Sequence, residues 1–97
     1  MTVQEIVQSV VEIVKRRLPE ERWRVLLFGS QATGTATPTS DIDIAIDGSE
    51  AVDASVLEAI VRESDALPTL RKIDIVDLAT KNKTFQESIR DTGKILS

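Results

Sequence analysis

Residues 27–44 read Leu-Phe-Gly-Ser-Gln-Ala-Thr-Gly-Thr-Ala-Thr-Pro-Thr-Ser-Asp-Ile-Asp-Ile, and this stretch decides the fold. The apolar run over 24–28 predicts a short buried strand. It ends at Gly29-Ser30, a pair that favours a turn and the start of a short helix. Small polar residues predict a turn-rich loop over 31–40. The alternation of Ile with Asp and Ala over 42–47 predicts a second, half-buried strand.

Two acids in this stretch suggest metal chemistry. Asp41 and Asp43 are two residues apart on the predicted strand, so both point to one side with Cα atoms about 6.6 Å apart. Carboxylates at this spacing can converge on cations about 3.5–4 Å apart, as in two-metal phosphoryl-transfer sites. Taken alone, an Asp-x-Asp pair is better explained by the solvated face of an edge strand.

The Gly29-Ser30 turn changes that balance. Glycine allows a phosphate to approach the backbone closely, free amides at a helix start attract anions, and the Ser30 hydroxyl can donate a further hydrogen bond. A phosphate cradle close in sequence to a pair of metal-binding acids predicts a site for a metal–nucleoside triphosphate.

A later apolar run, residues 73–78, predicts a third strand and offers a third carboxylate. Its acids Asp74 and Asp77 are three residues apart, so they face opposite sides and only one of them can join the pair. Asp47 shares the side of Asp43 but lies about 13 Å further along the strand. We expect Asp47 to be a turn residue.

Helices surround these strands. A capping box at Thr2-Val3-Gln4-Glu5 and apolar residues at helical spacing predict a helix over 3–17, which stops before Pro19. A second capping box, Ser55-Val56-Leu57-Glu58, predicts a helix over 55–66.

A last short helix is predicted from Thr84, with Gly93 as its stop. The resulting order is helix, strand, loop, strand, helix, strand, helix, which indicates a small α/β (α+β) fold in a single domain over residues 1–97. We expect a mixed sheet of three or more strands with helices mainly on one face, and a second face left open for a ligand or a partner.

Composition removes several classes of function. The chain has 97 residues, no Cys and no His, which excludes disulfide frameworks, thiolate nucleophiles, histidine triads and imidazole metal sites. Catalysis would then depend on other polar side chains and on a hard metal held by oxygen ligands. The net charge of −4 argues against general nucleic-acid binding. No apolar run reaches about 18 residues and the N-terminus lacks a basic region, so we expect no membrane span, no signal peptide and a cytoplasmic location.

Taken together, these motifs resemble the nucleotidyltransferase superfamily with a DNA polymerase β-like fold. More narrowly, the chain is similar to the minimal nucleotidyltransferases (MNT), the small partners of HEPN-domain proteins. The resemblance is carried by four stretches: Phe28-Gly-Ser-Gln-Ala-Thr-Gly34, Ser40-Asp-Ile-Asp-Ile44, Ile73-Asp-Ile-Val-Asp-Leu78 and the C-terminal residues 85–96.

The resemblance implies a role for each motif residue. Nucleotide binding would fall to Gly29, Ser30 and Ser40. Catalysis and the binding of two Mg²⁺ ions would fall to Asp41, Asp43 and Asp74. Asp77 would be structural or support the site indirectly. In one departure from the family pattern, Gln31 and Thr33 stand where Arg is frequent, which leaves less positive charge for phosphate.

The implied activity is transfer of a nucleoside monophosphate, AMP from ATP, onto a hydroxyl of an acceptor. The expected acceptor is a tyrosine of a HEPN-type partner, with the chain acting as antitoxin of a two-component module. The chain has no Tyr of its own. Two alternatives stay open: a non-catalytic subunit that binds nucleotide or partner, and transfer to a small molecule of the aminoglycoside type. We also expect that the chain can form a homo- or hetero-oligomer.

Overall fold

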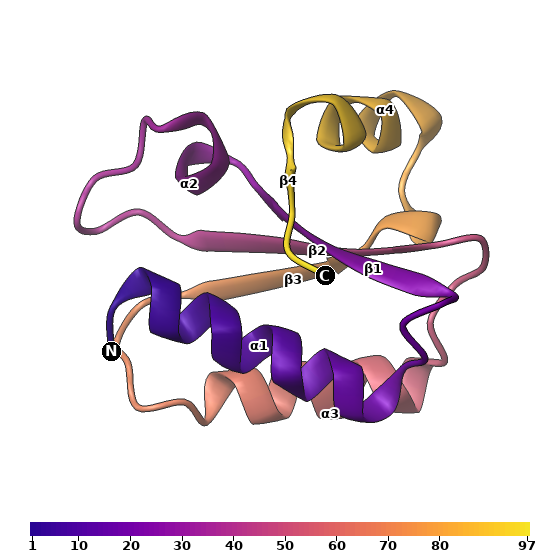
Figure 1. Cartoon of the computed structure of the whole chain (residues 1–97), viewed down its shortest axis with the longest axis horizontal. Helices are drawn as coiled ribbons and strands as arrows, with labels where there is room; N and C mark the ends of the chain where they lie inside the picture. The colour runs from indigo at the N-terminus through magenta and orange to yellow at the C-terminus, as the bar shows by residue number, and fades with distance from the viewer.

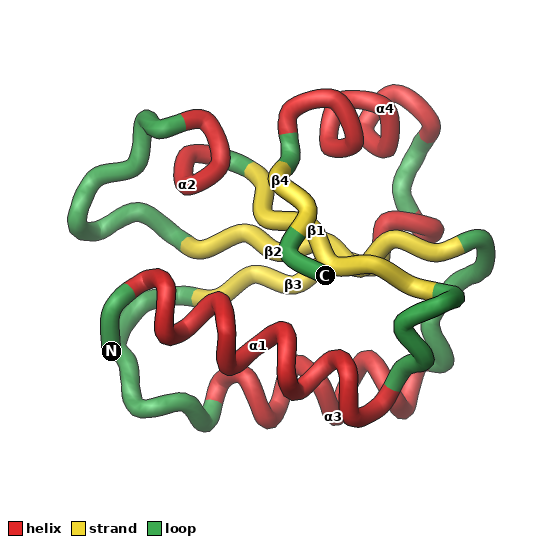
Figure 2. Tube along the Cα trace, in the orientation of Figure 1, coloured by secondary structure: helices red, strands yellow, loops and turns green.

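The computed structural model describes residues 1–97 and has a four-stranded sheet with the strand order β3-β2-β1-β4 (Figures 1 and 2). The elements along the chain are α1 (Val3–Arg17), β1 (Trp23–Phe28), α2 (Ser30–Thr33), β2 (Ile42–Gly48), α3 (Ala54–Asp65), β3 (Ile73–Asp77), the 3-10 helix η1 (Leu78–Thr80), α4 (Lys83–Thr92) and β4 (Lys94–Ile95). The predicted order of elements is confirmed, and β4 is an addition to it.

The sheet is mixed, as predicted. β1 pairs antiparallel with β2 and places Phe28 opposite Asp43. β2 pairs parallel with β3 and places Asp43 opposite Asp74. A parallel pair needs a crossover connection, and α3 supplies it between β2 and β3. β4 extends the other edge by pairing antiparallel with β1.

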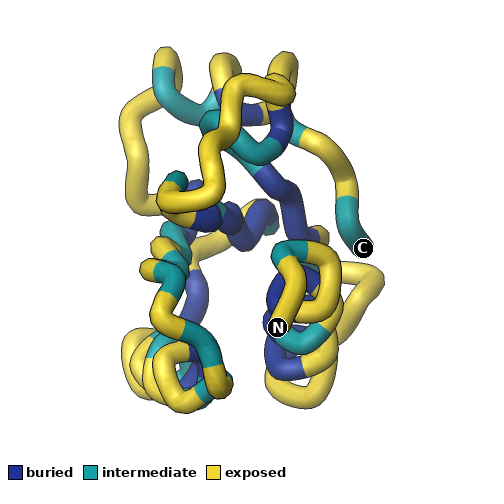
Figure 3. The backbone as a smooth tube through the Cα atoms, turned by 90° about the vertical axis from the view of Figure 1, so that its left-hand side faces the viewer, coloured by how far each residue is buried: buried dark blue, intermediate teal, exposed yellow.

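One face of the sheet carries the main core. The long helices α1 and α3 lie side by side below the sheet in Figure 1. Fifteen buried residues form the apolar cluster between these helices and the sheet, and the alternate residues of β2 point into it: Ile42, Ile44 and Ile46. Figure 3 shows the buried backbone running through the strands and along the inner sides of the helices. None of the helices combines the length and apolar character needed to cross a bilayer.

The first residues of α1 and α3 can be compared with the two capping boxes that the sequence predicted. The capping box of α1 is confirmed: the Glu5 amide donates to Thr2 Oγ1 at 3.1 Å and the Thr2 amide donates to Glu5 Oε1 at 2.9 Å. The capping box predicted for the second helix is wrong. Asp53 caps α3 instead, accepting from the Ser55 amide at 2.9 Å, so Ser55 lies inside the helix.

Helix α4 covers part of the opposite face. It begins at Lys83, one residue earlier than predicted, because the side chain of Asn82 caps it through the Phe85 amide at 2.8 Å. Its buried Ile89 joins a second apolar cluster with Leu26, Ala45 and Leu78. The ring of Phe85 meets that of Phe28 edge-on, with centroids 6.1 Å apart. The helices do lie mainly on one face, as expected, but the second face is open only where α4 does not cover it.

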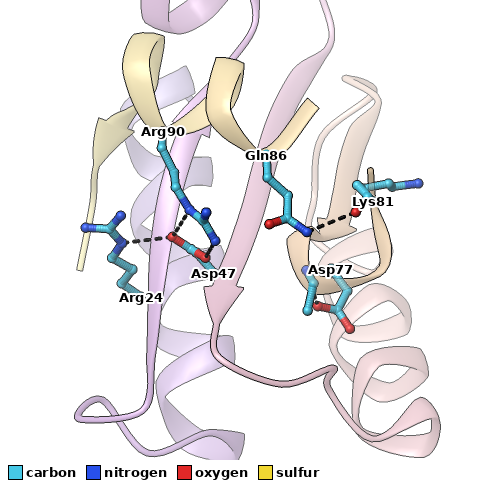
Figure 4. A network of polar contacts seen from close by, with 7 residues as sticks. Arg24, Asp47, Asp77, Lys81, Gln86 and Arg90 are labelled. Atoms are coloured by element: carbon cyan, nitrogen blue, oxygen red, sulfur yellow. Dashed lines mark hydrogen bonds and ion pairs between the residues drawn. The ribbon is translucent and has the colours of Figure 1, made fainter. Parts of the chain in front are cut away.

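Asp47 corrects a second expectation. It lies within β2 rather than in a turn, and its side chain is only 7% exposed. Arg24 Nε donates to Asp47 Oδ2 at 3.0 Å, while Arg90 donates to both carboxylate oxygens, through Nη2 at 2.9 Å and Nε at 3.2 Å (Figure 4). Asp47 points to the face that α4 covers, so it ties α4 to the two central strands.

Replacing Asp47 by Asn should destabilise the protein. Burial alone would raise the pKa of Asp47, but hydrogen bonds and charge from Arg90 and Arg24 outweigh it and lower the pKa. The carboxylate therefore stabilises the fold above its unfolded pKa of about 3.9, and this contribution is lost as the pH falls through the lower folded value. Urea unfolding at pH 7 should show a loss of about 2 kcal/mol for D47N.

The matched control is Asp91→Asn, since Asp91 is an exposed acid of α4 and forms no ion pair. The difference between D47N and the unaltered protein should shrink when unfolding is measured well below pH 4. A D47N protein as stable as D91N at pH 7 would contradict the anchoring role.

Candidate active site

The parallel register of β2 and β3 brings two of the three predicted acids together. Asp43 lies directly opposite Asp74, on strands whose axes are about 4.8 Å apart. Asp41 immediately precedes β2, on the side that Asp43 shares by alternation. Asp41 and Asp74 are exposed and Asp43 is half-buried. The acids therefore gather where β2 and β3 begin, on the face that also carries α2 and α4.

Asp77 takes no part in this cluster. It is 3% exposed, with Oδ2 accepting from the Val52 amide at 2.7 Å and Oδ1 accepting from the Ala79 amide at 3.3 Å. It is the last residue of β3 and caps η1, and Figure 4 shows it near the segment that carries Lys81. Its contacts hold the connection into α3 and the start of η1, which is the structural role expected of it.

The Gly29 backbone lies against Asp43. Gly29 follows β1 and caps α2, with φ 71° and ψ −153°, a region that almost only glycine adopts. A Cβ atom built on Gly29 would lie 2.4 Å from Asp43 Oδ2. This position therefore needs glycine both for its backbone angles and for the space that the carboxylate occupies.

The predicted turn does open a short helix, α2. Its first amides, those of Ser30 and Gln31, precede any carbonyl that the helix could offer them. The next two amides, of Ala32 and Thr33, donate to the Gly29 carbonyl at 3.1 and 3.2 Å. The Gln31 side chain has its buried Nε2 atom without a hydrogen-bond partner. The turn formed by residues 29–34 therefore presents hydrogen-bond donors but has no charged side chain of its own.

Ser40 is engaged within its own loop. Its Oγ accepts from the Thr37 amide at 2.8 Å, and its carbonyl accepts from Arg71 Nη1 at 3.0 Å. These contacts tie the polar loop before β2 to the segment that precedes β3. A role for Ser40 in nucleotide binding stays a prediction.

Crowding of the carboxylates perturbs Asp43. Partial burial raises the pKa of Asp43, the nearby charges of Asp74 and Asp41 raise it further, and Lys72 opposes the shift. A cation placed among these acids would relieve the repulsion. Carboxylate oxygens are the hard ligands that Mg²⁺ prefers, so the donor set fits this ion. No three acidic side chains in residues 1–97 are gathered closely enough to hold a metal by themselves.

The active-site corner consists of the Gly29-Ser30 turn with Asp41, Asp43 and Asp74. Lys72 belongs to this corner although it lies outside every sequence motif. Its carbonyl accepts from the Ile42 amide at 2.9 Å, which continues the pairing of the strands one residue before β3. Strand alternation then places its side chain on the face of Asp74. Parity with Asp74 is the signal in the sequence that could have found it.

A groove of about 950 Å³ opens beside the corner. Its polar lining includes Asp41, Arg71 and Lys72, and its apolar lining includes Leu70, which is fully exposed. It reaches the start of β2 and β3 but does not extend to Asp43 or Asp74.

The mixed sheet, with acids of two parallel strands meeting beside a Gly-Ser turn, has the arrangement that the sequence motifs predicted for a nucleotidyltransferase. Residues 8–97 match the polymerase beta nucleotidyltransferase family. The chain belongs to this family and is a nucleotidyltransferase. No curated protein matches it in sequence.

Solved structures share the fold. A toxin–antitoxin complex with AMP-PNP contains a chain with a TM-score of 0.74 and 25% identity, over 94% of this chain and 72% of that one. A chain in the structure of a tri-AMPylated Shewanella oneidensis HEPN toxin in complex with MNT antitoxin has a TM-score of 0.69 and 22% identity, over 97% of this chain and 71% of that one. A chain in a MntA–HepT toxin–antitoxin complex likewise has a TM-score of 0.69 and 22% identity, over 97% of this chain and 71% of that one. At these lower identities the likeness concerns the fold.

Proposed function

We propose that the chain transfers AMP from ATP, with Mg²⁺, onto a hydroxyl of a HEPN-type partner and so acts as the antitoxin of a two-component module. The single observation that carries the proposal is the pairing of Asp43 with Asp74 beside Gly29, within a nucleotidyltransferase fold. Structures of similar fold include a toxin–antitoxin complex with AMP-PNP and an AMPylated HEPN toxin bound to MNT antitoxin, which favours this acceptor over a small molecule.

The reaction is an in-line displacement at the α-phosphorus. The acceptor oxygen forms a bond to the α-phosphorus while the bond to the bridging oxygen breaks, and pyrophosphate leaves. Asp74 accepts the proton of the attacking hydroxyl. It is exposed and lies on the edge strand β3, so a protein acceptor can reach it from outside the sheet.

The triphosphate would lie against Gly29 and Ser30. The amides of Ser30 and Gln31, which have no helix carbonyl to bond, would donate to the phosphates, and the Ser30 hydroxyl would donate to a further phosphate oxygen. Mg²⁺ held by Asp43 and Asp74, with Asp41 close in sequence, would neutralise phosphate charge and lower the pKa of the acceptor hydroxyl. Because Mg²⁺ in such sites is usually held by one or two carboxylates together with substrate phosphates, a cluster of fewer than three convergent acids fits this role.

Transfer can be tested with ATP labelled at the α-phosphate, the full chain, Mg²⁺ and a purified HEPN-domain partner. Label should appear on the partner with release of one pyrophosphate per AMP, and EDTA should abolish it. ATP labelled at the γ-phosphate is the control and should leave the partner unlabelled. A stable complex without label would contradict catalysis and favour the non-catalytic binding subunit.

A further inference from the structure

The active-site corner is short of positive charge on the side where a triphosphate would lie. No Lys or Arg occurs between Arg24 and Arg62, so the Gly29-Ser30 turn, the polar loop and β2 carry no cation. A nucleoside triphosphate brings several negative charges to acids that already repel one another. Mg²⁺ would neutralise part of this charge, and any cationic side chain that adds to it must come from another segment.

The segment before β3 supplies two cations, of which one is free. Arg71 donates Nη1 to the Ser40 carbonyl at 3.0 Å, so its guanidinium is partly used in holding the loop. Lys72 is exposed and forms no ion pair, although its charge reaches Asp43. Its backbone is fixed by the hydrogen bond from the Ile42 amide at 2.9 Å, while its four-carbon stem is free to move.

We propose that Lys72 binds the phosphate chain of the nucleotide and supplies the positive charge that the Gly-Ser corner lacks. The inference rests on the proposed function. Lys72 lies on the face of Asp74 and lines the groove together with Asp41. Its ammonium group can therefore reach a phosphate chain bound beside these two acids. A lysine suits this role because it is a mobile point charge with three donors.

The test compares Lys72→Met with Lys83→Met in the full chain. Lys83 is an exposed lysine at the start of α4, beyond the opposite end of β3, so both variants lose one charge. Calorimetry with ATP and saturating Mg²⁺ should give a Kd at least about tenfold weaker for K72M and unchanged for K83M. K72R should recover most of the affinity.

Binding of Mg²⁺ alone separates this role from a structural one. Removing a cation beside the acids should leave Mg²⁺ binding unchanged or tighter, whereas a disturbed corner would weaken both ligands. ATP binding by K72M as tight as by K83M, or equal weakening of ATP and Mg²⁺, would overturn the inference alone. Failure of the unaltered protein to bind ATP would overturn the proposed function together with it.

Discussion

The variant Asp43→Asn should lose nucleotidyl transfer by at least about a hundred- to a thousandfold, because removing even one preorganised neutral hydrogen-bond donor from an active site costs about this much. Asn keeps the shape of the side chain but removes the charge that, in the proposed mechanism, would hold Mg²⁺ opposite Asp74. The α-phosphate label assay measures the loss. Partner binding should persist.

The same variant should be at least as stable as the unaltered protein. Burial and the charges of Asp74 and Asp41 raise the pKa of Asp43, so its ionised form disfavours folding. Between the unfolded pKa and the raised folded pKa the native state binds more protons, and the metal-free protein therefore loses stability as the pH rises through this window. D43N should not show this loss. Urea unfolding in EDTA between pH 4 and pH 7 provides the measurement.

Asp65→Asn is the control, because Asp65 is an exposed acid at the end of α3 and forms no ion pair. It should retain both transfer and the pH dependence of stability. Transfer by D43N at the rate of D65N would contradict the assignment of Asp43, and a D43N protein that unfolds more easily at pH 7 would contradict the electrostatic argument.

Replacing Gly29 by Ala should damage both stability and activity. The added Cβ forces a strained backbone, which costs about 1–3 kcal/mol. It would also meet Asp43 Oδ2 at 2.4 Å, so either the carboxylate or the end of β1 must move. A displacement of about 1 Å in a reacting site can cost about a hundredfold in rate. Urea unfolding and the label assay give the two quantities.

Gly34→Ala separates the two causes. Gly34 also has a positive φ, 78°, but no atom lies within 4 Å of the place where its Cβ would be. G34A should therefore lose about 1 kcal/mol of stability from backbone strain and keep its activity. Equal loss of activity in both variants would show that strain in the loop, rather than the position of Asp43, governs transfer.

The parts of the fold that follow from short-range chemistry could be predicted. The apolar spacing and capping box of α1 gave its bounds, and the alternation in β2 gave the face on which Asp43 points. In the third strand, the spacing of Asp74 and Asp77 predicted that only one of them joins the cluster. These features depend on backbone geometry and on neighbours within a few residues.

The parts that were missed depend on distant partners. Nothing near Asp47 in the sequence indicates that Arg90, 43 residues away, would bury it beneath α4. β4 is two residues long and exists only because β1 offers it an edge. Lys72 precedes its strand; parity indicates the side it shares with Asp74, but its closeness to Asp43 appears only once the register with β2 is known. Tertiary pairing, rather than local propensity, decides each case.

The alternation along β2 also limits how the protein can diverge. In the proposed mechanism Asp43 holds the metal, while Asp47 bonds Arg90 of α4, and both roles require the two side chains to point to the same face. Inserting or deleting one residue between them would turn one of the two into the apolar core, since each step along a strand reverses the side. Loops such as residues 34–40 can change length without this penalty. We therefore expect relatives of this chain to vary in loop length while keeping the number of residues in β2.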